Sequence, residues 1–369
     1  MRQIRSLTAL RFFAAMLVFA WHIGLLKNLQ LGYVGVSFFY ALSGFILAYN
    51  YSPAFSQLSK KSVLSFYSAR FARIYPVYLM SFFLAVPVTP ERLFASPSQW
   101  VISGLANIFL VQSFIPNMNI FFGFNGVAWS LSDEMWFYVL FPFLLYGVLR
   151  LSAKYNKQVV VLWGALSTWL ALILFLLPQH VGLNNWLAYV FPVTRLPDFV
   201  VGMLMGVRFL NGPITNDKSP RQYSLFTLLE VSGVLLVIVS ILYSPYVEQS
   251  LRFSAFYIPV WAYVISIFAY QRGALSRILS LRFPVFLGNL SFVFYMVHQV
   301  GLKYLALFPS LANLHGMIVI LFVLIVSVSA FLYRFYEEPL RKVVRAKLTH
   351  RLSAPPYPDI VEPIRRVRT

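Results

Sequence analysis

The stretch YVGVSFFYALSGFILAYN, residues 33–50, decides the fold class. It holds no charged side chain, and as one helix it is long enough to cross most of a hydrocarbon core ~30 Å thick. Similar apolar runs recur from near the first residue to about Phe335. Over the 369 residues, 59% are hydrophobic, 11% are charged and the mean hydropathy is +0.72, which does not suit the polar shell of a water-soluble globule. The sequence therefore predicts an all-α, polytopic integral membrane protein.

Lysine and arginine side chains set the orientation of the predicted crossings. Apolar length gives about ten crossings, at residues 8–27, 33–50, 74–90, 126–149, 158–178, 190–210, 224–243, 253–270, 284–306 and 315–335. When both termini face the cytoplasm, the inside segments collect most of the basic residues, and the outside keeps only a few, such as Lys27, Arg92 and Arg252. This distribution follows the positive-inside rule. We therefore expect both termini in the cytoplasm.

Two segments fall outside this scheme. Residues 97–116 are apolar, but a full crossing there would invert every later loop and move the basic ones outside. We predict a re-entrant or interfacial helix instead. Residues 341–369 are basic and contain proline, which predicts a disordered cytoplasmic tail attracted to anionic lipid head groups. The transmembrane domain is then expected to span residues 1–340.

The charge balance and the missing cysteine exclude several classes of function. A net charge of +19 would suit nucleic acid only on a soluble basic face, whereas here the basic residues lie between apolar runs. The expected partner of this surface is therefore the lipid bilayer, and no nucleic acid is expected. The absence of Cys excludes a thiol nucleophile, a Cys-ligated metal and a disulfide.

Ionisable side chains inside the predicted crossings are few. Each is a functional candidate, because a charge in lipid costs at least a few kcal/mol. Arg11 and His22 leave the same face of the first helix, since a spacing of eleven residues makes three turns plus ~20° and an axial rise of about 16 Å. That face would carry an anion-binding group near the cytoplasm and a candidate general base in the outer half. The alternative is a snorkelling arginine and a hydrogen-bonded core histidine that share a face by chance.

Two adjacent carboxylates, Asp133 and Glu134, lie beside Trp129 early in an apolar run. Folding alone explains them poorly, and they could orient a histidine, bind a sugar hydroxyl or balance Arg195. Arg195 and Asp198 are three residues apart, so a structural ion pair within one helix is the alternative to a binding role.

Three further residues can be interpreted either as structural or as functional. Arg70 and Arg73 precede the third predicted crossing, where arginine is common at the cytoplasmic end. His298 lies in the ninth crossing and is either a helper at the site or a packing residue with satisfied hydrogen bonds.

The order of these motifs resembles acyltransferase family 3, whose members acylate carbohydrates and other secreted or lipid-linked acceptors. The early matching motifs are ALRFFAAMLVFAWH with Arg11 and His22, GVSFFYALSGFILAY at residues 35–49, and FYSARFARIYPVYL with Arg70, Arg73 and Pro76. The later ones are WSLSDEMWFY with Glu134, RLPDFVVGM with Arg195, Asp198 and Gly202, LGNLSFVFYMVHQ with Gly288, Ser291, Tyr295 and His298, and YEEPLR with Glu337 and Pro339. One motif is weak evidence, but six or seven in order over nearly the whole chain are strong.

The resemblance implies an enzyme whose acyltransferase domain is residues 1–340, in the form without a soluble hydrolase-like domain, embedded in the bacterial inner (plasma) membrane. The implied reaction moves an acyl group, with acetyl the expected one, from cytoplasmic acyl-coenzyme A (acetyl-coenzyme A) to a hydroxyl of an extracytoplasmic carbohydrate such as an exopolysaccharide or lipopolysaccharide. No metal is implied. The implied catalytic residues are His22, Arg11 and Glu134, and the implied donor-binding residues are Arg11, Arg70 and Arg73. The implied acceptor-binding residues are Glu134, Trp129, Arg195, Asp198 and His298, and Asp133 is added as an acceptor-binding candidate because it adjoins Glu134.

Departures from the family pattern affect mainly the acceptor. Thr8 stands where the family often has Asp, and Asp133, Met135 and Trp136 surround Glu134 where other residues are usual. The main rival is a transporter or flippase of glycans or lipids, which would also need intramembrane charges. A non-catalytic scaffold or sensor gives no reason for paired ionisable groups at lipid depth.

Overall fold

The fold is known from a computed structural model, which describes residues 3–89, 97–155, 164, 186–212, 219–312, 314 and 316–350. Within these ranges all regular secondary structure is helical, and seven helices are long and apolar enough to cross a membrane. These are Leu31–Tyr51, Lys60–Val88, Trp129–Leu151, Trp186–Asn211, Pro220–Tyr246, Arg282–Ala306 and Met317–Leu348. The all-α membrane architecture is therefore confirmed. The count of ten crossings and the cytoplasmic termini stay predictions, and the predicted crossing at 158–178 lies outside the described residues, apart from Gly164.

The first predicted crossing ends earlier than its hydropathy suggests. Helix α1 (Arg5–His22) stops at His22 rather than near residue 27. Two positions just beyond it, Gly24 and Leu26, have positive φ angles of 76° and 50°, which a continuing right-handed helix cannot accommodate. His22 therefore lies in the last turn of α1, at the start of the turn that leads into α2 (Leu31–Tyr51).

The third predicted crossing begins earlier than expected. Helix α3 (Lys60–Ala85) starts with a capping box in which Ser59 and Ser62 satisfy each other's backbone N–H groups. Arg70 and Arg73 were predicted to precede this crossing, which was expected to begin at residue 74, and this is wrong, because both lie on α3. The charged residues lowered the local hydropathy without interrupting the helix.

The remaining helices follow the order of the predicted runs. They are α5 (Pro97–Ile108), α6 (Met118–Phe121), α7 (Trp129–Tyr155), α10 (Pro192–Asn211), α11 (Pro220–Tyr243), α12 (Gln249–Arg252), α13 (Ile258–Ala269), α14 (Ala274–Leu279), α15 (Arg282–Ala306), α16 (Pro309–Ala312), α17 (Met317–Leu332) and α18 (Glu338–His350). Helix α5 has 12 residues and a length of about 18 Å, which is too short for a full crossing. Its re-entrant or interfacial position stays a prediction.

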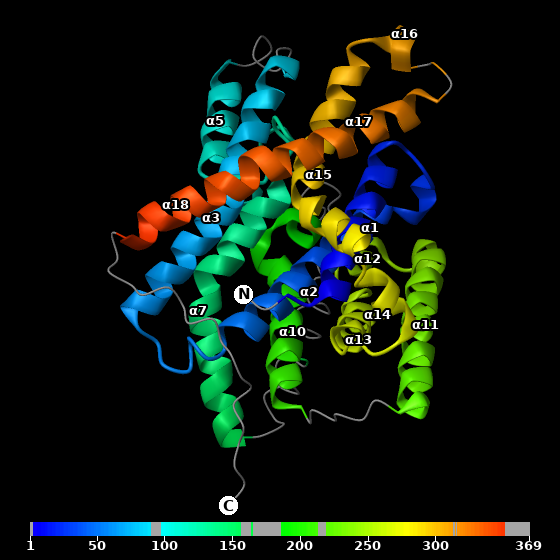
Figure 1. The fold of residues 1–369 in the computed structure, drawn as a ribbon. Helices are drawn as coiled ribbons and strands as arrows, with labels where there is room; N and C mark the ends of the chain where they lie inside the picture. The colour runs from blue at the N-terminus through cyan, green and yellow to red at the C-terminus, as the bar shows by residue number, and fades with distance from the viewer. Residues whose placement is uncertain are drawn as a thin grey trace, which may run out of the picture.

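Helices α1, α2, α10 and α15 form the centre of the bundle, with α3, α5 and α7 on one side and α11 on the other (Figure 1). Small residues bring the central backbones into contact. A Cβ added at Gly202 of α10 would overlap the Ala41 carbonyl of α2, and one added at Gly288 of α15 would overlap the Thr8 carbonyl of α1. Membrane helices pack closely at such residues. Close helix packing therefore explains why glycine occupies positions 202 and 288 of the family-like motifs.

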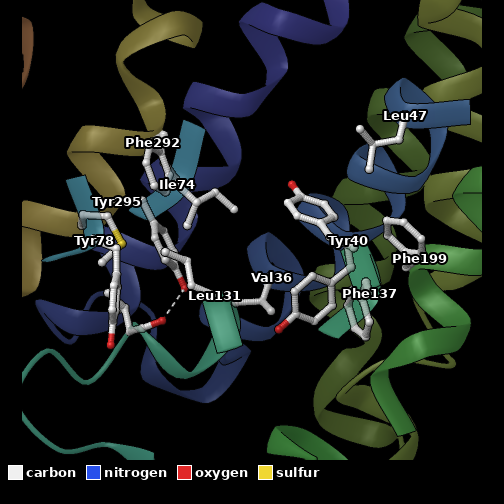
Figure 2. Close-up of a cluster of buried hydrophobic side chains, with 14 of the residues drawn as sticks. Val36, Tyr40, Leu47, Ile74, Tyr78, Leu131, Phe137, Phe199, Phe292 and Tyr295 are labelled. Carbon is white, nitrogen blue, oxygen red and sulfur yellow. Dashed lines mark hydrogen bonds between the residues drawn. The ribbon is translucent and has the colours of Figure 1, made fainter. Parts of the chain in front are cut away.

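Buried aromatic side chains fill the space between these helices. Tyr40 of α2, Phe137 of α7 and Phe199 of α10 lie together on one side of the core (Figure 2). The Tyr40 and Phe137 ring centroids are 5.0 Å apart, and those of Phe137 and Phe199 are 5.3 Å apart. Edge-to-face and tilted pairs at these distances are favourable. The packing holds fixed the polar side chains that the same helices carry.

The last crossing continues beyond its predicted end. Helix α17 passes through a π-helical turn, Tyr333–Glu337, directly into α18, so the predicted domain boundary at residue 340 falls inside a continuous helix. Helix α18 lies across α3 (Figure 1). Residues 341–350 were predicted to begin a disordered tail, and they are helical instead, because the π turn and the contact with α3 extend the helix. Residues 351–369 lie outside the described residues.

Candidate active site

Two histidines from distant parts of the sequence meet at the end of α1. His298 Nε2 on α15 lies 3.2 Å from His22 Nδ1. His22 Nδ1 also lies 2.9 Å from the Val18 carbonyl, and His298 Nδ1 lies 3.2 Å from the Phe294 carbonyl. His298 is fully buried, whereas His22 is partly exposed. His22, the predicted base, can therefore be reached by a ligand from outside the protein core, whereas His298 cannot.

Aromatic rings continue from this histidine pair along the same end of the bundle. Trp21, which precedes His22, contacts Tyr33 at the start of α2 with ring centroids 6.1 Å apart. Tyr33 contacts Tyr189 at 4.6 Å, and Tyr189 contacts Trp129 at the start of α7 at 4.5 Å. This places Trp129 at the His22 end of the bundle, although it does not contact either histidine.

The other half of α1 faces basic groups and a carboxylate. Arg11 interacts electrostatically with Glu134, Tyr138 and Arg70. Glu134 accepts hydrogen bonds from Ser43, at 2.9 Å, and from Tyr138. Arg11 itself makes no hydrogen bond or ion pair within the described ranges. Its guanidinium is therefore the group of this cluster with the greatest capacity for an outside ligand.

Arg70 and Arg73 differ in how their charges are balanced. Arg70 lies over the rings of Tyr51 and Tyr138, at 5.7 and 5.9 Å, in cation–π geometry. Arg73 forms an ion pair with Glu337, which is 2% exposed and belongs to the π-helical turn before α18. We name Arg11, Arg70 and Arg73 the arginine cluster. Arg73 holds the last helix in place, and Arg11 and Arg70 face Glu134.

The adjacent carboxylates Asp133 and Glu134 point to different places. Neighbouring residues on a helix diverge by about 100°, and Glu134 therefore joins the arginine cluster while Asp133 enters the core. Asp133 is fully buried and accepts a hydrogen bond from Tyr40 at 2.8 Å, and its Oδ1 has no partner within the described ranges. Glu134 makes no hydrogen bond to His22 among the described residues, and a role in orienting that histidine stays a prediction.

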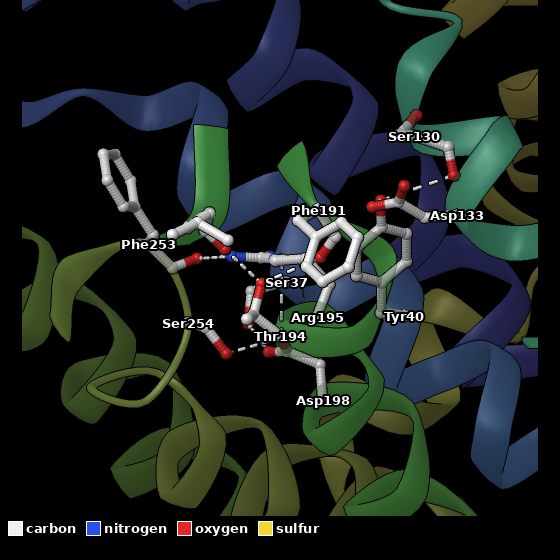
Figure 3. Close-up of polar contacts among 11 residues, drawn as sticks. Ser37, Tyr40, Ser130, Asp133, Phe191, Thr194, Arg195, Asp198, Phe253 and Ser254 are labelled. Carbon is white, nitrogen blue, oxygen red and sulfur yellow. Dashed lines mark hydrogen bonds and ion pairs between the residues drawn. The ribbon is translucent and has the colours of Figure 1, made fainter. Parts of the chain in front are cut away.

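Arg195 and Asp198 form a buried ion pair, with Nε and Oδ2 3.6 Å apart (Figure 3). Arg195 also donates to the Phe253 carbonyl. Asp198 accepts hydrogen bonds of 2.5 Å from Ser37 of α2 and from Ser254, which precedes α13. Both charged side chains are at most 1% exposed. This geometry favours the structural alternative, in which the pair joins α10 to α2 and to the 253–254 turn.

The structure thus gathers the predicted residues at three places. His22 and His298 meet at one end of α1, the arginine cluster and Glu134 lie toward the other end, and Arg195 and Asp198 lie in the protein interior with Asp133 next to Tyr40. The roles assigned to these residues stay predictions.

Several contact residues escaped the sequence analysis. Tyr138 lies one turn after Glu134 on α7, so helical spacing could have predicted their hydrogen bond. Ser43 lies in the uncharged stretch at residues 33–50, and its contact with Glu134 depends on how α2 and α7 pack, which the sequence does not reveal. Glu337 was named in the YEEPLR motif, but its ion pair with Arg73 was not predicted, because it joins helices far apart in the sequence.

Within the described part of the chain, no group of three or more His, Cys, Asp or Glu side chains is arranged to hold a metal ion. A helical membrane protein with a histidine pair at one end of a helix and a basic cluster toward the other has the parts of a group-transfer enzyme. The family model described as an acyltransferase domain matches residues 4–334, and the chain therefore belongs to acyltransferase family 3 and is an acyltransferase. This finding removes the transporter and scaffold interpretations.

Individual relatives agree with the family. The acyltransferase MdmB of Streptomyces mycarofaciens is 32% identical over 338 residues, which cover 82% of this chain and 80% of the relative. The O-acetyltransferase OatA of Staphylococcus aureus is 22% identical over 354 residues, which cover 92% of this chain and 58% of the relative. No solved structure matches the chain.

Proposed function

We propose that this protein is an O-acyltransferase of the bacterial inner membrane that moves an acyl group from cytoplasmic acyl-coenzyme A to a hydroxyl of an extracytoplasmic carbohydrate. One observation carries the proposal: Arg11 and His22 share a face of α1 about 16 Å apart along its axis, and His298 of α15 contacts His22. A relative named an O-acetyltransferase supports acetyl as the transferred group.

The donor is assigned to the arginine cluster. Coenzyme A carries phosphates, and guanidinium groups are well suited to bind them. Arg11 and Arg70 supply that charge, whereas Arg73 is engaged by Glu337. Glu134, held by Ser43 and Tyr138, interacts electrostatically with both arginines and limits the repulsion between them.

The acceptor is assigned to the other end of α1. His22 is partly exposed there, and a chain of contacting rings, Trp21, Tyr33 and Tyr189, begins at the residue before it. Aromatic rings offer the apolar faces of sugar rings a flat surface, and this supports a carbohydrate acceptor. The exopolysaccharide or lipopolysaccharide identity of that acceptor belongs to the same proposal.

The reaction needs one base and no redox chemistry. His22 takes the proton of the acceptor hydroxyl as the oxygen attacks the thioester carbonyl carbon. The new C–O bond forms, the C–S bond breaks, and the leaving thiolate receives the proton from His22. The histidine ends in its starting state, so each turnover yields one ester and one free coenzyme A thiol.

Release of free coenzyme A from acetyl-coenzyme A by the purified protein, with a glycan acceptor, tests the activity. We expect acceptor-dependent release, with acetylated glycan detected by mass spectrometry. His22→Ala should abolish transfer and retain donor binding. Near-normal turnover of this variant would remove His22 from the mechanism.

Arg11→Ala tests the direction of the reaction. Loss of one charge-assisted contact costs about 1.5–3 kcal/mol, so the KM for the donor should rise by roughly 10- to 150-fold with a smaller effect on the acceptor. Equal damage to both substrates would indicate that Arg11 is a structural residue.

A further inference from the structure

We propose that His298 is a positioning residue that holds His22 in the one tautomer whose Nε2 serves as the base. The inference rests on the proposed function, because it assigns a role within the same site. His298 does not touch either substrate. It acts through the contact of its Nε2 with His22 Nδ1, 3.2 Å away.

The tautomers follow from the two backbone carbonyls. A carbonyl oxygen only accepts, so the nitrogen that faces it must carry a proton. His298 Nδ1 faces the Phe294 carbonyl at 3.2 Å and is therefore the N–H of that ring. In a neutral imidazole the other nitrogen is then an acceptor, and His298 Nε2 presents a lone pair to His22.

The same reasoning applies to His22. Its Nδ1 lies 2.9 Å from the Val18 carbonyl and 3.2 Å from the lone pair of His298 Nε2, so Nδ1 must carry the proton and donate to both acceptors. The opposite assignment would set lone pairs against each other at both contacts. Within the described ranges His22 Nε2 has no hydrogen-bond partner, and its lone pair is available to an acceptor hydroxyl.

The surroundings of His298 keep it in this acceptor state. Its ring is enclosed by Phe19, Phe294 and Tyr295, with centroids 6.1, 5.8 and 5.8 Å away. Tyr295 is the titratable neighbour, and no carboxylate interacts with either histidine among the described residues. When His22 is protonated, a second positive charge 3.2 Å away would be unfavourable, so His298 stays neutral and stabilises the new charge on His22.

The proton balance assigns each histidine a separate part. His22 Nε2 receives the hydroxyl proton and returns it to the leaving thiolate, and His22 Nδ1–H stays bound to Val18 and His298 throughout. His298 neither gains nor loses a proton. Its contribution is to orient the ring and to stabilise the protonated base, as a third group does in a nucleophile–base pair.

Nitrogen-15 NMR of histidine-labelled protein, without any substrate, tests the tautomer directly. The chain has five histidines, and the signals lost in His22→Ala assign those of His22. We expect a protonated Nδ1 and an unprotonated Nε2 at neutral pH. In His298→Leu, the tautomer with Nε2 protonated should become detectable. A wild-type His22 with Nε2 protonated would overturn the proposal.

Kinetics test the consequence. His298→Leu should lower kcat by about 10- to 100-fold, the usual effect of losing an outer partner, with the donor KM unchanged. The acid limb of the pH profile should move to lower pH, because protonated His22 has lost an acceptor. His298→Gln, which can place an amide oxygen near the former Nε2, should recover most of kcat. Met296→Leu is the matched control on the same helix, at a fully buried side chain outside the site.

The outcomes separate the two proposals. If wild-type protein and Met296→Leu release no coenzyme A with any acceptor, the proposed function fails, while the NMR result still decides the tautomer. If they turn over normally and His298→Leu matches them in kcat and pH profile, the role of His298 is wrong. Equal losses in the Leu and Gln variants with an unmoved acid limb would make His298 a purely structural residue. If His298→Leu does not fold, the Gln variant and the wild-type NMR decide the matter.

Discussion

Gly202→Ala should destabilise the protein by separating α2 from α10. The Cβ of the alanine would overlap the carbonyl oxygen, carbonyl carbon and Cα of Ala41. These are backbone atoms in the middle of α2, and no side-chain rotation relieves the overlap. The two helices must move apart along the length of their contact.

The size of the effect follows from two opposing contributions. Overpacking in a tight core costs about 1–3 kcal/mol, and a backbone obstacle places this site at the upper end. Alanine is the better helix former by ~1 kcal/mol, which offsets part of the loss. The net destabilisation is about 2 kcal/mol. Gly147→Ala on α7 is the matched control, because its Cβ would meet nothing within 4 Å.

Thermal unfolding in detergent at a fixed scan rate measures the difference. The chain has eight tryptophans and no cysteine, so intrinsic fluorescence is the suitable probe and thiol-reactive dyes are not. We expect an apparent Tm roughly 4 °C lower for Gly202→Ala, and an unchanged or slightly higher Tm for Gly147→Ala. Equal Tm values for the two variants would refute the close approach of α2 and α10.

Three other substitutions separate structural from functional roles. Glu337→Gln leaves Arg73 without its ion-pair partner and should lower the free energy of unfolding by about 2–3 kcal/mol. Glu338→Gln is the control, because the partners of Glu338 are mostly exposed, and it should lower the free energy of unfolding by under ~1 kcal/mol in the same assay. Asp198→Asn weakens a buried ion pair and should lower the apparent Tm while the KM values of the folded fraction stay unchanged, and a raised acceptor KM would restore its binding role. Ser43→Ala removes a hydrogen bond to Glu134 of about 1 kcal/mol and should raise the donor KM roughly fivefold, so a change confined to the acceptor KM would contradict the donor assignment.

Hydropathy predicted the class of fold because lipid imposes one requirement on every crossing, namely apolar length. Hydropathy misplaced helix ends where a helix carries charged residues or where an apolar segment is not helical. Arg70 and Arg73 lower the hydropathy of α3 but face Tyr51, Tyr138 and Glu337, and a helix tolerates them there. Similarly, α1 ends at His22 through backbone geometry that an apolar average does not detect.

The site was predictable within one helix and not between helices. Spacing alone placed Arg11 and His22 on one face, because both belong to α1. The contact of His22 with His298 joins residues 276 positions apart, and only the packing of α1 against α15 creates it. Asp133 and Glu134 were adjacent in sequence and seemed a pair, yet helical geometry sends them to separate environments.

Helix α1 contains neither proline nor glycine between Arg5 and His22, and its backbone is held against α15 at Gly288. The helix is therefore rigid and fixes the distance between Arg11 and His22. Under the proposed mechanism, the donor must be long enough to reach from Arg11 to His22, and the arm between its phosphates and its thioester is selected by that length rather than by shape. Under the same mechanism, insertion of one helical turn between Arg11 and His22 should leave both ends intact and uncouple them, so that the variant binds both substrates and transfers no acyl group.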